Sequence, residues 1–577
     1  MIRLTELKLP LGHADADLEG LVLRTLGLAA EAVRGFDVFK RSVDARKVQL
    51  QWVYIVDVTL ADADAGAEAA LMSSLSGLPH VGPSPDMGYR PVRQVPPGAP
   101  AVQQGGRPVV VGFGPCGIFA ALLLAQMGLR PIVLERGRTV RRRTKDTWGL
   151  WRKSVLDPES NVQFGEGGAG TFSDGKLWSQ IKDPRHLGRK VMTEFVKAGA
   201  PADILVEAHP HIGTFKLVKV VENMREQIIA LGGEVRFEQR VTDLHLEDGP
   251  ADGQGRTRRV RALSVLNQAT GVTTELAARQ VVLAPGHSAR DTFVMLYRCG
   301  VQMAAKPFSI GFRIEHPQSL IDRARWGRHA GHPALGAAEY RLVHHAGNGR
   351  SVYSFCMCPG GTVVAATSEP GRVVTNGMSQ YSRNERNANA GIVVGIDPVD
   401  YPRDIARLRA ALGDDVPAQE TTMATHPLTG IVLQRELESG AYRLGGSSYQ
   451  APGQLVGDFL SARPSKALGA VEPSYQPGVL LGDLASALPP YAIDAIREAL
   501  PAFGRKIKGF DMPHAVLTGV ETRTSSPVRI TRGDDFQSLN VQGLYPAGEG
   551  ASYAGGILSA GVDGIRVAEA VAVAMMP

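Results

Sequence analysis

Three glycines, Gly112, Gly114 and Gly117, have the spacing of a turn that binds a dinucleotide. They follow a short β-branched run at 109–111 and precede an apolar helical pattern at 118–127. In such a turn the first glycine permits a tight bend, the second lets the backbone approach a pyrophosphate, and the third lets the helix pack on the strand. The helix N-terminus favours the anion. The spacing therefore predicts a pyrophosphate site, with the intervening Pro115 and Cys116 also in contact.

A carboxylate closes the next predicted strand, at residues 130–134. Glu135 lies 23 residues after Gly112, close to the offset of about 20 at which an acidic residue binds ribose hydroxyls. We expect Glu135 and the adjacent Arg136 to contact the cofactor. A carboxylate here suits an adenosine without a 2′-phosphate, so the pattern favours FAD or NAD over NADP.

A second glycine-rich segment, residues 165–175, has five glycines in eleven positions and is expected to form neither a stable helix nor a strand. Its backbone N–H groups suit an anion nest around a cofactor. Lys176 would place a cation beside a phosphate or a reduced flavin. The alternative is a flexible surface loop. The contact residues predicted here are Gly167, Gly168, Ala169, Thr171 and Ser173.

A buried strand predicted at 280–284 ends in Pro285-Gly286, which we expect to return the chain to the dinucleotide site. Val241, in a predicted meander of short strands, is a further expected contact. His287 and Asp291 come next and are candidates for an acid or a base. The alternative is that they cap the next helix.

The segment from Gly548 and Glu549 to Gly555, Gly556 and Ile557 precedes a closing helix rich in Ala and Val. It looks like a C-terminal flavin motif, in which the acidic residue binds the ribityl chain. The helix N-terminus would then stabilise negative charge on the reduced ring. The alternative is a turn that only packs the closing helix. The order of the motifs, fingerprint early and acidic motif last, favours FAD over NAD.

Cys356 and Cys358 form a Cys-x-Cys pair. Such a pair could act as a redox dithiol, whose disulfide would be strained and easily reduced. Zinc is disfavoured because no second cysteine pair supplies further ligands, and we predict no metal. The alternative is two buried cysteines beside a Gly-Gly turn. The candidate catalytic residues are Lys176, His287, Cys356 and Cys358.

Other polar residues could orient a substrate or serve only the fold. The run Arg141-Arg142-Arg143 is interpreted as a solvated loop. The substrate-orienting candidates are Arg313, Glu315, His426 and Arg523.

The elements around these motifs predict an α/β protein. We expect a small N-terminal α+β domain at 1–95, a linker at 96–107, and a Rossmann-like FAD-binding domain. The FAD domain would comprise residues 108–305 and 516–577, with a mixed α+β substrate domain inserted at 306–515.

Composition narrows the class of protein. Of 577 residues, 44% are hydrophobic and 21% charged, which excludes disorder as the main state. Four cysteines make no secreted disulfide framework. No apolar run approaches the roughly 20 residues needed to span a bilayer. We therefore expect a cytoplasmic protein without a membrane span, whose oligomeric state the sequence leaves open.

Together these segments resemble a bacterial family of uncharacterised FAD-dependent dehydrogenases. The resemblance implies a glutathione-reductase-type FAD fold with an inserted second domain and a small N-terminal domain, and leaves the substrate unassigned. More distantly the chain is similar to flavoproteins that saturate isoprenoid chains or act on RNA. The matching strings are residues 42–47, 164–177, 286–291, 306–311, 355–361 and 546–556.

Our leading hypothesis is an FAD-dependent oxidoreductase with non-covalent FAD, transferring hydride between flavin N5 and a C–H or C=C of a small molecule. Only one fingerprint with a following carboxylate is visible. Either NAD(P)H binds transiently without a dedicated domain, or the substrate or another protein supplies the electrons. A second hypothesis, a flavoenzyme acting on RNA, draws on the pI of about 9.1, the arginine run and the N-terminal domain. A third is an FAD-binding redox sensor or scaffold that uses Cys356 and Cys358.

Overall fold

A parallel sheet at the centre of the molecule provides the predicted dinucleotide site. In this computed structural model, residues 1–576 are described except 46–48, 62–64, 76, 97–105 and 414–425. Most of the predicted linker at 96–107 therefore lies outside the described residues. The sheet has five parallel strands in the order β23 (Leu544–Pro546), β11 (Val281–Leu283), β5 (Val109–Val111), β6 (Ile132–Leu134) and β7 (Glu234–Arg236).

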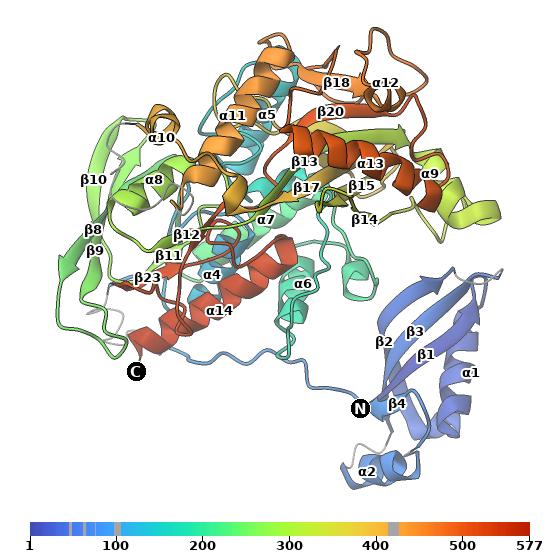
Figure 1. Ribbon diagram of the computed structural model, residues 1–577. Helices are drawn as coiled ribbons and strands as arrows, with labels where there is room; N and C mark the ends of the chain where they lie inside the picture. Colours follow the sequence, from blue (N-terminus) through green and yellow to red (C-terminus); the bar gives the residue numbers. More distant parts are fainter. Residues whose placement is uncertain (46–48, 62–64, 76, 97–105, 414–425, 577) are drawn as a thin grey trace.

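Helices pack on this sheet where the sequence predicts them. The fingerprint helix α4 (Pro115–Gln126) lies beside the closing helix α14 (Ile557–Met575), as Figure 1 shows. The two backbones approach so closely that a Cβ at Gly564 would lie 2.3 Å from the Cys116 carbonyl oxygen. The other helices of this half are α5 (Val140–Lys153), α6 (Leu187–Lys197), α7 (Thr214–Ala230) and α8 (Arg290–Arg298).

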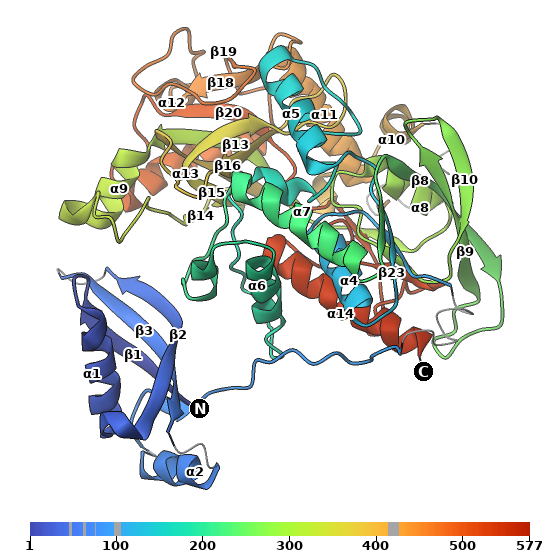
Figure 2. The ribbon, with the colours of Figure 1, turned by 180° about the vertical axis from the view of Figure 1, so that it is seen from behind.

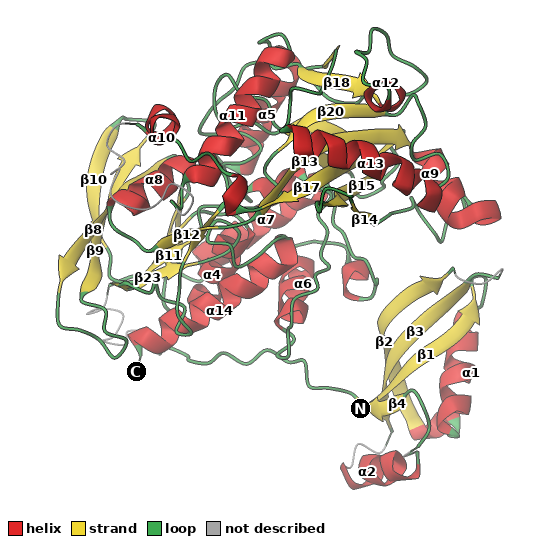
Figure 3. Cartoon of the chain, in the orientation of Figure 1, coloured by secondary structure: helices red, strands yellow, loops and turns green. Residues whose placement is uncertain are grey.

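A predominantly antiparallel sheet forms the second half of the body, above the parallel sheet in Figure 3. Its core is apolar, with Phe312, Ile392 and Val520 fully buried. The strand order is β14 (Val343–His345), β15 (Ser351–Ala365), β17 (Asn387–Ile396), β13 (Phe308–Pro317), β20 (Val516–Glu521), β18 (Ala451–Leu455) and β19 (Val479–Leu481), and β16 (Thr375–Ser379) pairs with β15.

Helices of this half are α9 (Gln318–Trp326), α10 (Ile405–Leu412), α11 (Thr429–Leu444), α12 (Val456–Leu460) and α13 (Pro490–Lys506). Because β20 belongs to the eight-stranded sheet, we propose that the inserted substrate domain continues through Glu521 before the chain returns to the FAD domain.

Two smaller sheets accompany the two main sheets. The predicted meander is present as β8 (Gln239–Asp248), β9 (Arg258–Asn267) and β10 (Val272–Ala277), with β22 (Val541–Gln542) added to β9. A two-stranded sheet pairs β12 (Met303–Ala305) with β21 (Val528–Ile530).

The N-terminal domain lies to one side of the body, at the end of an extended segment (Figures 1 and 2). Its contact with the body includes a backbone bridge at Arg41, whose N–H donates to Val206 and whose carbonyl accepts from Ala208. The domain contains α1 (Asp15–Leu26), α2 (Ala65–Ser74) and a sheet in the order β2 (Val33–Asp44), β3 (Gln51–Leu60), β1 (Ile2–Pro10) and β4 (Val81–Pro83).

No helix among the described residues is long and apolar enough to cross a bilayer.

Candidate functional site

A cavity of about 400 Å³ lies where the carboxyl ends of the parallel strands meet the eight-stranded sheet. In open α/β sheets this edge is where ligands bind. The cavity brings together segments from all the glycine-rich motifs, although they are far apart in the sequence. The predicted cofactor-contact residues that line it are Gly112, Gly114, Pro115, Cys116, Glu135, Arg136, Gly168, Ala169, Ser173, Val241, Pro285, Gly286, Gly548, Glu549, Gly555, Gly556 and Ile557.

Three predicted contacts do not line the cavity. Gly117 packs the helix on the turn, since a Cβ there would lie 1.9 Å from the Gly112 carbonyl oxygen. Gly167 and Thr171 face each other, and a Cβ at Gly167 would lie 2.1 Å from the Thr171 hydroxyl. Of the catalytic candidates, Lys176, His287 and Cys356 line the cavity, whereas Cys358 is fully buried and does not line it.

The conformation of the turn at residues 112–117 depends on glycine at the close backbone contacts. Gly112 has a φ of 97°, a conformation that side chains disfavour, and a Cβ there would lie 2.2 Å from the Ala284 carbonyl oxygen. Gly114 is the N-cap of α4 and Pro115 follows at its first turn, where a missing N–H costs nothing. The free N–H groups of this helix end lie at the cavity.

Glu135 organises the turns around the cavity. Its carboxylate accepts hydrogen bonds from the N–H groups of Phe113 (2.8 Å), Gly137 (2.8 Å) and Gly165 (2.9 Å). A carboxylate offers about four acceptor positions, so one remains for a ribose hydroxyl.

Arg136, beside Glu135, pairs with Glu159 and with Asp291, at 2.8 Å in each case. Asp291 is therefore committed to an ion pair. The alternative prediction, that His287 and Asp291 cap α8, is wrong, because the N-cap is Ala289 and no side chain caps it.

The arginine run at 141–143 is not the solvated loop that its composition suggested. It lies in α5, and Arg143 is fully buried. Arg143 donates to the carbonyl oxygens of Asn161, Val162 and Glu166, each at 2.7 Å. These hydrogen bonds hold the backbone that leads into the glycine-rich segment. Burial lowers the pKa of Arg143 to about 10.

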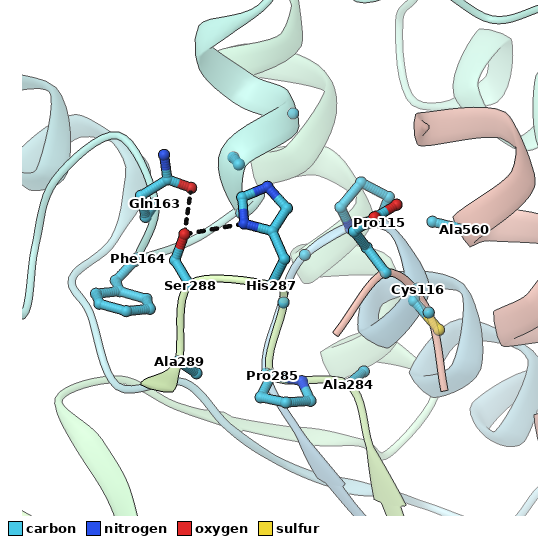
Figure 4. Close-up of a pocket in the computed structure, with 18 of the residues that line it drawn as sticks. Pro115, Cys116, Gln163, Phe164, Ala284, Pro285, His287, Ser288, Ala289 and Ala560 are labelled. Carbon is cyan, nitrogen blue, oxygen red and sulfur yellow. Dashed lines mark hydrogen bonds between the residues drawn. The ribbon is translucent and has the colours of Figure 1, made fainter. Parts of the chain in front are cut away.

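His287 is held in one orientation by a chain of hydrogen bonds (Figure 4). The amide of Gln163 donates to the Ala366 carbonyl, so its oxygen accepts from Ser288 at 3.1 Å. Ser288 Oγ has then used its proton, and His287 Nδ1, 2.9 Å away, must donate to it. Burial, together with the cation of Arg523, lowers the His287 pKa to about 3. The imidazole is therefore neutral, with Nε2 as its acceptor.

Glu549 supplies the clearest test of whether the cavity fits a cofactor. Burial raises the pKa of its carboxyl to about 7, and its Oε1 is buried with no hydrogen-bond partner among the described residues. Such an atom is costly unless a donor reaches it. Glu549 lines the cavity a few residues before the N-terminus of α14, where Gly556 has no neighbour within 4 Å of an added Cβ. A ligand with hydroxyl groups and an anionic end fits these residues, as FAD does.

The eight-stranded sheet contributes a polar wall that the sequence reasoning largely missed. Arg313 and Arg523 were nominated, but the partner Glu521 and the neighbouring Asn376 were not, and no local pattern marks them. The buried Arg313 pairs with Glu521 at 2.7 Å and donates to Asn376 at 3.0 Å. Burial raises the Glu521 pKa to about 7. The wall residues include Phe355, Cys356, Asn376, Glu521, Arg523 and Thr524.

Of the four substrate-orienting candidates, Arg523 lines the cavity, and Arg313, Glu315 and His426 do not. The carboxylate of Glu315 accepts from Ser474 and Asn387. The ring of His426 packs against Tyr297, with centroids 4.7 Å apart.

Fold and site define the class: a protein with a Rossmann-type dinucleotide-binding sheet and a second domain that closes the site. A family described as "FAD-dependent protein, C-terminal domain-like" matches residues 307–524, and a domain of unknown function matches residues 1–59. An uncharacterised protein of Clostridium beijerinckii is 44% identical over 575 residues, covering 98% of both chains. The chain belongs to this family of FAD-dependent proteins.

Several solved structures align more distantly. Quinol fumarate reductase of E. coli is 14% identical, with 81% of this chain and 70% of that chain covered and a TM-score of 0.33. A geranylgeranyl bacteriochlorophyll reductase-like protein of Thermoplasma acidophilum is 11% identical, with 81% and 78% covered and a TM-score of 0.31. Glycerol-3-phosphate dehydrogenase of Bacillus halodurans, complexed with FAD, is 13% identical, with 54% and 53% covered and a TM-score of 0.24. Likenesses with TM-scores this low carry no argument about the reaction or the substrate.

Proposed function

We propose that the protein is an oxidoreductase that binds FAD non-covalently in this cavity and exchanges hydride with a small organic molecule. The observation that carries the proposal is the convergence of the separated glycine-rich motifs on one cavity containing the unpartnered carboxylate oxygen of Glu549. When bound, FAD supplies the site that takes or gives the electron pair.

The chain's own residues would hold the two ends of the cofactor. The turn at Gly112 and Gly114, with the N-terminus of α4, suits the pyrophosphate. The remaining acceptor position of Glu135 suits a ribose hydroxyl, and Glu549 Oε1 suits a ribityl hydroxyl. The N-terminus of α14 would favour negative charge on the reduced ring.

The substrate side would be the wall from the eight-stranded sheet. Glu521 accepts from Arg313 through Oε2, which leaves Oε1 for exchange with a bound molecule. Its pKa of about 7 suits a group that gives or takes a proton near neutral pH. Saturating a C=C bond needs such a proton beside the hydride. We therefore propose Glu521 as the proton donor or acceptor and His287 as a neutral hydrogen-bond acceptor.

The electron donor belongs to the proposal as well. The described residues contain one five-stranded parallel sheet of the dinucleotide-binding kind, so NAD(P)H would have to bind transiently, or another donor would serve. The hypothesis of an RNA substrate drew partly on the arginine run at 141–143. That support is weaker because Arg143 is buried.

A pair of glycine variants tests the cofactor site. A Cβ at Gly114 would meet only the Gly168 Cα, at 3.6 Å, so Gly114→Ala is tolerated by the fold but narrows the pyrophosphate site. We expect purified wild-type protein to contain FAD, identified by the mass of the released flavin, and Gly114→Ala to bind it at least tenfold more weakly. Gly440→Ala, where a Cβ has no neighbour within 4 Å, is the matched control.

Folded wild-type protein that neither contains nor binds FAD would refute the proposal. FAD affinity unchanged in Gly114→Ala would remove the assigned pyrophosphate site. An anaerobic absorbance titration with NADPH and then NADH would next decide the donor, since bleaching of the flavin band identifies a nicotinamide-fed enzyme and a persistent band another donor.

A further inference from the structure

Cys356 and Cys358 lie at an irregular place in β15. The strand pairs regularly with β17 up to Phe355, opposite Gly391, and resumes at Cys358, opposite Asn389. Two residues on β15 therefore face one on β17, which is a β-bulge, a device that re-aims side chains beside functional sites. Cys356 has a φ of 43°, an uncommon conformation for a residue with a side chain. Cys356 of the bulge lines the cavity, whereas Cys358 is fully buried and does not line it.

The two sulfur atoms are close partners. The Cys358 thiol donates to the Cys356 carbonyl oxygen at 3.4 Å and also hydrogen-bonds to the Cys356 sulfur. That second bond is the main cause of a lowered Cys356 pKa and a raised Cys358 pKa. Of the two thiols, Cys356 in the cavity wall is therefore the one that ionises more readily.

Two cations flank the pair. Arg313 donates to the Cys356 carbonyl at 2.9 Å, and the Lys176 ammonium donates to the Met357 carbonyl. Both charges lower the Cys356 pKa further. The cations reach the bulge from β13 and from the glycine-rich loop, so both halves of the body converge on this sulfur.

The other cysteines provide the contrast. Cys116 also lines the cavity, but burial and the nearby Asp563 raise its pKa. Burial raises the Cys299 pKa to about 11. Cys356 is thus the cysteine whose pKa is lowered, whereas the pKa values of Cys116, Cys299 and Cys358 are raised. Packing alone accounts for neither the bulge nor the two cations.

We propose that Cys356 and Cys358 are a redox-active dithiol that passes electrons from the reduced flavin to a disulfide substrate. The proposal rests on the proposed function and names a substrate class for it. The oxidised pair takes one hydride equivalent, two electrons and one proton, from the reduced flavin: the S–S bond breaks, Cys358 takes up the proton, Cys356 becomes a thiolate, and the flavin is oxidised. The Cys356 thiolate then attacks a substrate disulfide, forms a mixed disulfide with one half and releases the other half as a thiolate, which takes a proton from water. Cys358 passes its proton to the second half of the substrate as it attacks Cys356 Sγ, which releases that half as a thiol and restores the S–S bond.

A route for a small disulfide is present beside the pair. A second hollow, of about 720 Å³, shares Phe355, Thr524 and Gly555 with the cofactor cavity and is lined by Ser309 and Arg350, among others. Phe355 directly precedes Cys356 in the chain. A low-molecular-weight disulfide in this hollow would reach the cofactor cavity at Phe355, next to Cys356.

Anaerobic dithionite titration of the air-oxidised holoprotein tests the pair by counting electrons. A flavin alone takes about one equivalent per FAD, and a flavin with a disulfide takes about two. We expect about two equivalents for wild type and about one for both Cys356→Ser and Cys358→Ser. Cys299→Ser, a cysteine outside the cavity, should behave like wild type. Peptide mass spectrometry should find the oxidised Cys356–Cys358 peptide two mass units lighter than its reduced form.

Wild type that takes about one equivalent and keeps four free thiols after oxidation would overturn the proposal. If a serine variant fails to fold or to bind FAD, the proposal is still tested, because the peptide mass of oxidised wild type by itself shows whether the Cys356–Cys358 disulfide forms. Absence of FAD from wild type would refute the proposed function, whereas FAD present without a Cys356–Cys358 disulfide would refute only the dithiol. Oxidised glutathione should reoxidise the reduced wild-type flavin without oxygen, and neither serine variant should respond.

Discussion

Replacing Glu549 with Gln tests the inference that its carboxyl awaits a donor from the cofactor. In the protein without FAD, burial raises the pKa of this group from 4.5 to about 7, against the weaker effects of Lys306 and of the Ser526 backbone. The folded state thus holds a proton that the unfolded chain has already released. Glu549→Gln keeps the shape of the side chain and removes the titration.

The sign and size of the effect follow from linkage. A carboxyl whose pKa is raised by folding contributes stability below about pH 4.5 and loses it as the pH rises through about 7. At about 1.4 kcal/mol for each pKa unit, the loss amounts to about 3 kcal/mol. Glu521 has a similar pKa and causes a second loss of unfolding free energy as the pH rises. Wild type should therefore show the losses from both carboxyls, and Glu549→Gln only the loss from Glu521.

Urea unfolding of the apoprotein between about pH 5 and about pH 8 measures this difference. We expect wild type to lose about 2.5 kcal/mol more than Glu549→Gln over that range, because part of the full loss falls below pH 5. Glu226→Gln, which alters an exposed carboxylate on α7, should follow wild type. With FAD bound, a hydroxyl donated to Glu549 favours the ionised carboxylate, so FAD affinity should rise with pH in wild type and not in Glu549→Gln. Equal pH profiles for the two proteins, with and without FAD, would refute the assignment of Glu549.

Three further variants report on neighbouring features. Lys176→Met removes a cation beside the Cys356 sulfur and should slow its alkylation by iodoacetamide about tenfold near pH 6, and an unchanged rate would exclude the cation's role. Arg313→Met leaves Glu521 buried without its partner and should lower the unfolding free energy by about 3–5 kcal/mol, measured in urea at about pH 8, with a smaller loss at about pH 5, where Glu521 is protonated. Phe312→Ala empties a fully buried position of the eight-stranded sheet and should cost about 3–5 kcal/mol while FAD content is retained.

The parts of the site that sequence could predict are those governed by local backbone geometry. Gly112 forms the tight turn, Gly117 lets α4 pack on that turn, and the strand Val109–Val111 precedes α4. These features are predictable because glycine spacing and apolar runs determine the backbone within a few residues. The closing helix α14 and the short strands of the meander arise from the same short-range patterns. That these segments meet at one cavity is also predictable, since the carboxyl ends of parallel strands share an edge.

The partners of charged residues could not be predicted in this way. A run of three arginines is typical of a solvent-exposed segment, yet Arg143 in the first turn of α5 is buried and donates to carbonyl groups of Asn161, Val162 and Glu166, at and just before the glycine-rich segment. Glu135 has the expected place, but its three backbone donors depend on how separate turns meet. Glu521 is far from Arg313 in the chain, and only the pairing of β13 with β20 brings them together.

A buried cluster of charges joins the two walls of the cavity. Arg290 comes after the parallel strand β11, Arg523 comes after β20 of the eight-stranded sheet, and both donate to Glu438 of α11, at 2.6 Å and 3.0 Å. All three are buried, and the two cations hold the Glu438 pKa at about 2. Replacing such a buried group with apolar side chains often costs little stability, so stability alone does not account for it. We infer that it fixes the distance between the cofactor wall and the wall that contains Cys356. Hydride transfer needs that distance held closely, and no local sequence pattern encodes it.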